Sequence, residues 1–158
     1  MTPMGAVHPR VLGFLGRALS LELSAVQQYM TQASLLDLWG QQEAAAHFRR
    51  DTGEEMKHAE RIVQRMLSLA VTPGASQLRP VTTAADLEGL LRLNAGLEHD
   101  LIQHYAEALR FCILIGDDEN EAFFRALWSD EQRHGEELAR WLQQLASDPR
   151  GLHARATF

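Results

Sequence analysis

The sequence is short of the residues that mark several classes of protein. Only one of its 158 residues is cysteine, Cys112, so no disulfide can form within the chain, and its apolar neighbours predict a buried thiol. This cysteine usage favours a reducing, cytoplasmic location. Proline (5) and glycine (11) are scarce beside 46% apolar residues. That composition excludes collagen-like and disordered chains and indicates one well-packed domain over residues 1–158.

Basic charge and long apolar runs are also missing. Lys and Arg total 15 against 21 Asp and Glu, a formal net charge of -6, so the sequence provides no general basic surface for nucleic acid. No apolar run reaches the roughly 18 residues that a membrane span needs. No basic segment precedes the apolar residues near the N-terminus, as it would in a signal peptide. We therefore expect neither nucleic acid nor a membrane as a partner.

What remains is rich in helix-forming residues. Ala, Leu, Gln, Glu and Arg dominate four long segments, and Val, Ile and Thr are few, so strands are not expected. We predict an all-α four-helix bundle with helices over about residues 10–38, 41–69, 84–115 and 119–147. Thr83 with Asp86 predicts a capping box at the third helix. Asp148 and Pro149 suggest a short fifth helix in the tail of residues 148–158.

The inward-facing positions of each predicted helix, spaced alternately by three and four residues, are apolar except near the middle. A carboxylate buried in a bundle core costs several kcal/mol unless a counter-charge is present. No inward-facing position at these levels holds Lys or Arg, so bound metal cations are the expected compensation. The exceptions are Glu22 in the first helix, Glu55 and His58 in the second, Glu98 in the third, and Glu131 and His134 in the fourth.

Two Glu-x-x-His segments, together with one Glu from each of two other helices, form the ligand set of carboxylate-bridged di-iron or di-manganese sites. One such segment alone is a weak signal, and the specificity comes from its position on the inward faces at compatible levels. Oxygen and nitrogen donors without a thiolate favour iron or manganese over structural zinc, and iron is our first choice. Glu54 and Asp130 are expected to accept hydrogen bonds from the ligating imidazoles. The alternative is that both are solvated surface acids.

The connection of residues 70–83 is long enough to change the topology. Its fourteen residues reach about 46 Å when extended, which exceeds the length of a bundle of about 43 Å. The second and third helices could therefore be joined by a crossover along the whole bundle. The levels of the six residues are compatible with this topology and equally with short loops.

Three segments together resemble the bacterioferritins, a family of the ferritin-like superfamily. They are LELSAVQQY at residues 21–29, EMKHAE at 55–60 and DEQRH at 130–134, and the resemblance extends from about Gly13 to Leu145. It implies a ferritin-like bundle with the long crossover. It also implies ferroxidase activity, in which Fe(II) is oxidised by O2 or peroxide, and storage of the ferric mineral in a cage of twenty-four subunits.

The resemblance also implies roles for individual residues. Glu22, Glu55 and His58 would ligate one iron and Glu98, Glu131 and His134 the other, with Glu55 and Glu131 bridging. Met56 would ligate haem b across a two-fold dimer interface, or else would simply pack in an interface. Tyr29 would be a redox-active or supporting phenol, or else a core residue. A ferredoxin-type reductant is the implied partner for iron release.

The chain departs from the family in places. Bacterioferritins often have a tyrosine in the second helix and a tryptophan after the last ligand motif, where this chain has Ile62 and Glu137. Two other functions compete with iron storage: a small dimeric di-iron oxidase or peroxidase, and a haem-carrying bundle without storage. The mass of the native assembly and its metal content distinguish the three.

Overall fold

The computed structural model describes residues 5–148, which form four long helices and no strand. All four helices were expected, and their bounds agree with the predicted ones to within one residue, except for the start of the third. The tail in which a fifth helix is predicted lies outside the described residues. The helices are α1 (Pro9–Leu38), α2 (Gln42–Ser68), α3 (Leu87–Ile115) and α4 (Asp118–Ser147).

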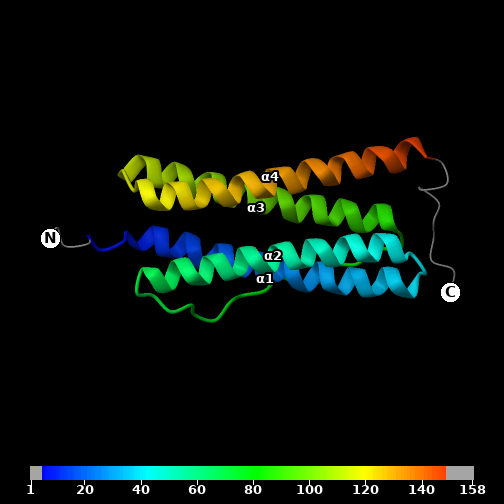
Figure 1. The fold of residues 1–158 in the computed structure, drawn as a ribbon, viewed down its shortest axis with the longest axis horizontal. Coiled ribbons are helices and arrows are strands. Elements are labelled where there is room, and N and C mark those ends of the chain that lie inside the picture. Colours follow the sequence, from blue (N-terminus) through cyan, green and yellow to red (C-terminus); the bar gives the residue numbers. More distant parts are fainter. Residues whose placement is uncertain (1–4, 149–158) are drawn as a thin grey trace.

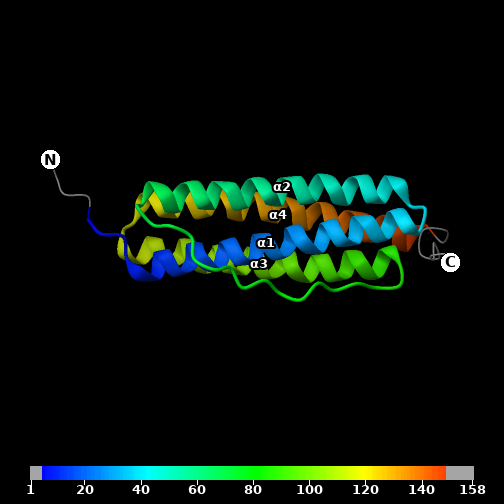
Figure 2. The ribbon, with the colours of Figure 1, turned by 90° about the horizontal axis from the view of Figure 1, so that it is seen from below.

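The helices form an elongated bundle with a long crossover between α2 and α3 (Figures 1 and 2). Short turns make α1 antiparallel to α2 and α3 antiparallel to α4, whereas the crossover makes α2 and α3 run in the same direction. Figure 2 shows the crossover, residues 69–86, following α1 and α3 along the side of the bundle. The structure thus has the crossover topology. The levels of the six inward polar residues along the helices were compatible with this topology and equally with short loops.

Local chemistry fixes the helix ends. His8 Nδ1 accepts a hydrogen bond from the Arg10 backbone N–H at 3.1 Å, and Pro9 occupies the first turn, where a missing N–H costs nothing. α3 ends at Gly116, whose φ of 71° lies in the left-handed region that glycine tolerates best. Asp117 then caps α4 by accepting from the Asn120 N–H at 3.2 Å. The chain can therefore reverse direction within two residues.

The start of α3 differs from the prediction. The helix begins at Leu87 rather than near residue 84, and the capping box expected from Thr83 is wrong, because Asp86 is itself the N-cap. Its side chain accepts from the Gly89 N–H at 2.8 Å. Ala84 folds back against this first turn, and a Cβ at Gly89 would come within 2.6 Å of the Ala84 Cβ. The close approach of the incoming chain thus requires glycine at position 89.

A row of polar side chains on α1 holds the crossover. Ser20, Ser24, Gln28 and Gln32 are spaced by four residues, so they form one stripe on the helix. Ser24 Oγ accepts from the Arg79 N–H at 2.9 Å, and Gln28 Oε1 accepts from Thr82 Oγ1 at 2.9 Å. The stripe satisfies backbone groups of a segment that has no secondary structure of its own.

The apolar core consists of two clusters, one toward each end of the bundle. The first includes Leu15, Ile62 and Phe124, and the second includes Leu36 and Phe48. Cys112 is fully buried in the first cluster, as predicted. Between the clusters lies a polar layer formed by the inward glutamates and histidines. Within residues 5–148, no helix is long and apolar enough to cross a membrane.

Candidate metal centre

The six inward acids and histidines come from all four helices and meet in the middle of the bundle. α1 and α3 each contribute one glutamate, and α2 and α4 each contribute a glutamate and a histidine three residues later, which lies on the same face. All six side chains are buried, with at most 8% of any residue exposed. The sequence pattern named all six, and the structure brings all six together: Glu22, Glu55, His58, Glu98, Glu131 and His134.

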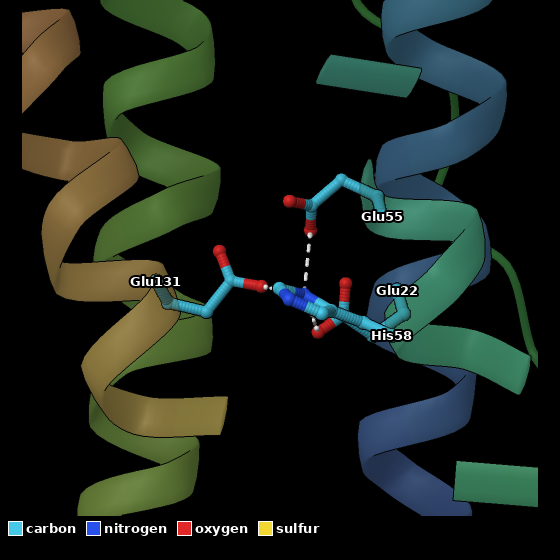
Figure 3. Close-up of side chains that lie close together, drawn as sticks. All are labelled: Glu22, Glu55, His58 and Glu131. Atoms are coloured by element: carbon cyan, nitrogen blue, oxygen red, sulfur yellow. Dashed lines mark hydrogen bonds and ion pairs between the residues drawn. The ribbon is translucent and has the colours of Figure 1, made fainter. Parts of the chain in front are cut away.

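Their ligand atoms form two overlapping groups, within each of which the atoms lie within 4.8 Å of one another. The groups share Glu55 and Glu131. Glu22 and His58 complete the first group, which Figure 3 shows with the His58 ring pointing among three carboxylates. Glu98 and His134 complete the second. Two neighbouring cations with two common carboxylates would match this arrangement.

Both histidines direct Nδ1 into the centre and Nε2 outward. His58 Nδ1 lies 2.8 Å from Glu131 Oε1, and His134 Nδ1 lies 2.9 Å from Glu55 Oε1. The outward nitrogens meet acids across the bundle. His58 Nε2 lies 3.3 Å from Asp130 Oδ2, and His134 Nε2 pairs with Glu54. Each outer acid of α2 or α4 thus supports the histidine of the other helix, an arrangement that fixes ring orientation in metal sites.

The charge of this layer is not balanced by Lys or Arg side chains. No Lys or Arg is buried within residues 5–148, and the Arg61 guanidinium contacts the outer acid Asp130 at 3.1 Å. Within the same residues, the Oε2 atoms of Glu22, Glu55, Glu98 and Glu131 are buried without a hydrogen-bond partner. Buried oxygens of this kind are costly unless a cation binds them. The donor set therefore fits divalent metal ions, which bind carboxylate oxygen and imidazole nitrogen.

Burial and mutual repulsion shift the pKa values of these groups. Burial first, and then the charge of Glu22, raise the pKa values of the Glu55 and Glu131 carboxyls well above the ordinary value. Burial acts to raise the pKa of Glu22, but hydrogen bonding with Glu55 and contact with His58 outweigh burial and lower that pKa. Burial opposes a charge on His134, yet its contacts with Glu55 raise its pKa to about 10. The metal-free centre therefore holds protons where metal ions would bind.

Two tyrosines adjoin the centre, of which the sequence analysis singled out only Tyr29. Its hydroxyl donates to Glu98 Oε1 at 2.6 Å, and the Tyr105 hydroxyl donates to Glu22 Oε1 at 2.6 Å. Burial and the nearby carboxylates raise both phenol pKa values well above normal, so both groups remain hydrogen-bond donors. Tyr105 was missed as a site residue although, like Tyr29, it follows an inward glutamate by seven residues. That spacing was the available signal.

Met56 lies away from the centre, on the outside of α2, and is 49% exposed. Arg49 of α2 forms an ion pair with Asp37 of α1. Because seven residues make nearly two helical turns, Met56 lies on the same face as Arg49, and Met30 lies on the same face as Asp37. Met56 of α2 and Met30 of α1 are therefore both exposed, on the helix faces that carry this ion pair.

Comparison with known proteins agrees with this fold. The family model of the ferritin-like domain matches residues 13–147. A bacterioferritin of Rhodobacter capsulatus is 34% identical over 125 residues, which cover 79% of this chain and 78% of the relative. A bacterioferritin of Brucella melitensis is 31% identical over 139 residues, which cover 88% and 86% of the two chains.

A solved structure of the Rhodobacter capsulatus bacterioferritin is also similar, with a TM-score of 0.87, 30% identity and coverage of 96% of both chains. It is described as having a metal-free dinuclear site and haem iron in a crystallographic special position.

The crossover bundle, with two Glu-x-x-His segments facing each other across its core, defines a ferritin-like protein. The sequence identity with the two bacterioferritins identifies the family within this class. The chain belongs to the bacterioferritin family. Its function is that of the family, the oxidation of Fe(II) and the storage of iron.

Proposed function

We propose that the six buried ligands form a dinuclear ferroxidase centre in which Glu55 and Glu131 bridge two iron ions. Glu22 and His58 would complete the coordination of one ion, and Glu98 and His134 that of the other. The observation that carries this proposal is the pair of overlapping ligand groups that share the two bridging carboxylates. Iron bound there supplies the one-electron chemistry of Fe(II) oxidation.

The protein would orient the ligands and supply the sites from which protons leave. Asp130 and Glu54 accept from the outer nitrogens of His58 and His134, which would leave each Nδ1 lone pair directed at an ion. The bridging carboxyls hold protons in the metal-free centre and would lose them when the ions bind. The two phenols would hold Glu22 and Glu98 in place.

Glu55→Gln tests the centre, because the amide keeps the side-chain volume but removes a bridging carboxylate. We expect the rapid phase of aerobic Fe(II) oxidation, followed by stopped-flow absorbance, to slow by at least about tenfold. Glu60→Gln is the matched control, since Glu60 is an exposed acid on the same helix, and it should behave as the unaltered protein. Unchanged oxidation in Glu55→Gln would refute the assignment of the centre.

We further propose that Met56 ligates haem b at a two-fold interface between subunits. The exposed Met56 thioether fits this role, and Gly53, one turn earlier, leaves open space where a side chain would otherwise stand. A special position lies on a symmetry element, so the haem iron of the Rhodobacter capsulatus protein is placed equally for symmetry-related copies. A bound haem would supply one-electron transfer.

Substitution at Met56 tests this ligand. The purified protein should show a Soret band that is lost in Met56→Leu. Met30→Leu should keep the band, because Met30 is also an exposed methionine but is not the proposed ligand. A Soret band of unchanged position and intensity in Met56→Leu would show that another group binds the haem.

Membership of the family supports self-association of this chain, since bacterioferritins self-associate and bind iron. The finer proposal is a hollow cage of twenty-four copies, which would give the oxidised iron an enclosed space for mineral. A ferredoxin-type reductant would then return electrons for iron release. A cytoplasmic location stays a prediction from the single cysteine.

A further inference from the structure

Both tyrosines of this chain donate hydrogen bonds to glutamates of the centre. The sequence contains only two, Tyr29 and Tyr105. Tyr29 of α1 donates to Glu98 of α3, and Tyr105 of α3 donates to Glu22 of α1, each at 2.6 Å. Each tyrosine follows the glutamate of its own helix by seven residues. The two hydrogen bonds thus correspond to one another as the two ligand groups do, with Tyr29 and Glu98 matching Tyr105 and Glu22.

Packing accounts for an aromatic ring at position 105, but it does not account for the hydroxyl that the ring carries. The ring is fully buried and packs near Phe124, with centroids 6.4 Å apart, and a phenylalanine would fill the same space. The hydroxyl is the added feature, and its acceptor is an oxygen of the Glu22 carboxylate. Tyrosine is readily oxidised by one electron when a base is in place to take its proton. Both phenols have such a base at hydrogen-bond distance.

We propose that Tyr105 is a second redox-active side chain of the centre, the counterpart of Tyr29, and that the two phenols provide the second pair of electrons that reduces O2 to water. This inference rests on the dinuclear iron centre proposed above. It assigns the two tyrosines equivalent roles, one beside each ion.

The reaction balances with groups that are present. Two Fe(II) ions give one electron each, and each phenol gives one electron while its O–H bond breaks and the proton passes to Glu98 Oε1 or Glu22 Oε1. Those two protons and two more from solvent convert one O2 into two water molecules, leaving two Fe(III) and two tyrosyl radicals. Two further Fe(II), the substrate itself, then reduce the radicals, and solvent protons restore the O–H bonds. Without the phenols, the same two Fe(II) ions and two solvent protons reduce O2 only to H2O2.

Freeze-quench electron paramagnetic resonance detects the radicals directly. Protein loaded anaerobically with Fe(II) and mixed with O2 should give a tyrosyl signal, and ring-deuterated tyrosine should narrow it. Because no third tyrosine exists, the signal left in Tyr29→Phe belongs to Tyr105, and Tyr29→Phe/Tyr105→Phe should give none. If Tyr29→Phe oxidises Fe(II) but yields no tyrosyl radical, the role of Tyr105 is overturned.

The reduction product of O2 gives an independent readout. The unaltered protein should consume about one O2 for every four Fe(II), whereas the double variant should consume about one for every two and release H2O2. Equal ratios in the two proteins would overturn the proposal. A purely positioning role for Tyr105 would change the oxidation rate but leave the ratio unchanged.

Metal binding separates this inference from the proposed centre. Calorimetry of the iron-free protein should show that Tyr105→Phe binds Zn(II) with the stoichiometry of the unaltered chain. If Tyr105→Phe binds less Zn(II), the freeze-quench spectrum of the unaltered protein with ring-deuterated tyrosine decides between the two roles. Two distinct tyrosyl signals in that spectrum support the inference, and a single signal overturns it. Rapid oxidation without radicals refutes only the role of Tyr105, whereas rapid oxidation that survives in Glu55→Gln refutes the centre itself.

Discussion

At the scale of single residues, Glu55 and Glu131 are carboxyl groups that are costly to bury in the charged form. Both are fully buried, both face other carboxylates, and both have raised pKa values for those reasons. His134, with a pKa of about 10, is protonated at pH 7. A group whose pKa is raised by folding stabilises the fold below its unfolded-state pKa and loses that contribution as pH rises through the folded value. For His134 the loss falls between about pH 6.5 and pH 10. Cations can replace these protons.

Proton release on metal binding follows from these pKa values. Zn(II) binding to the iron-free protein at pH 7 should release protons from Glu55, Glu131 and His134. Calorimetry in two buffers of different ionisation enthalpy measures this release, because the observed heats then differ. Glu131→Gln should release fewer protons, and Glu60→Gln as many as the unaltered chain. Identical heats in the two buffers would contradict the raised pKa values.

At the scale of elements, the crossover depends on α1 rather than on any structure of its own. Gln28 is the central contact: its oxygen accepts from Thr82, and its nitrogen donates to Asn94 Oδ1 of α3 at 2.9 Å. One buried amide therefore joins α1, the crossover and α3. The same contacts lie one to two turns from Glu22 and Glu98, so they also fix the relative level of the two helices that carry the lone glutamates.

Removing this amide should destabilise the protein measurably. Gln28→Ala removes the hydrogen bonds to Thr82 and to the buried Asn94 Oδ1, at a cost of about 1–3 kcal/mol in the free energy of unfolding, mainly from the buried amide oxygen. Urea denaturation followed by circular dichroism measures the loss. Gln27→Ala is the control, because Gln27 is exposed on the same helix and should cost less than about 0.5 kcal/mol. Equal midpoints for the two variants would show that the amide does not hold the crossover.

At the scale of the whole molecule, one end of the bundle leaves apolar side chains uncovered. Leu114 is 80% exposed and Ile113 55%, beside the turn between α3 and α4. Together with Ile115 they form a contiguous apolar tip, which an assembly of copies could bury. Such burial would support the self-association of the family.

Native mass measurement tests this reading of the tip. The unaltered chain should form a large assembly, and Leu114→Glu should shift the mass toward smaller species, because a carboxylate would be buried at each contact. Leu114→Ile keeps an apolar side chain of equal volume and should assemble normally. An assembly of unchanged mass in Leu114→Glu would exclude the tip from the subunit contacts.

The sequence by itself determined the helices and the six inward polar residues. Both follow from spacing along one chain segment, since residues three, four and seven apart share a helix face wherever the helix is placed. The expectation of bound metal also came from the sequence, because no inward-facing position at those levels holds Lys or Arg. The start of α3 was predicted wrongly, since Asp86 rather than Thr83 caps the helix, and Ala84 lies outside the helix against its first turn.

Only the tertiary structure decided which groups meet across helices. The sequence named Glu54 and Asp130 as supporting acids, but not that each serves the histidine of the other helix. The spacing of seven residues after Glu98 puts Tyr105 on the same helix face as that glutamate, but it does not reveal that the hydroxyl reaches Glu22. These pairings depend on which helices are neighbours and at what level, and that is set by the crossover and its contacts with α1. Spacing fixes the face on which a side chain lies, whereas packing between helices fixes its partner.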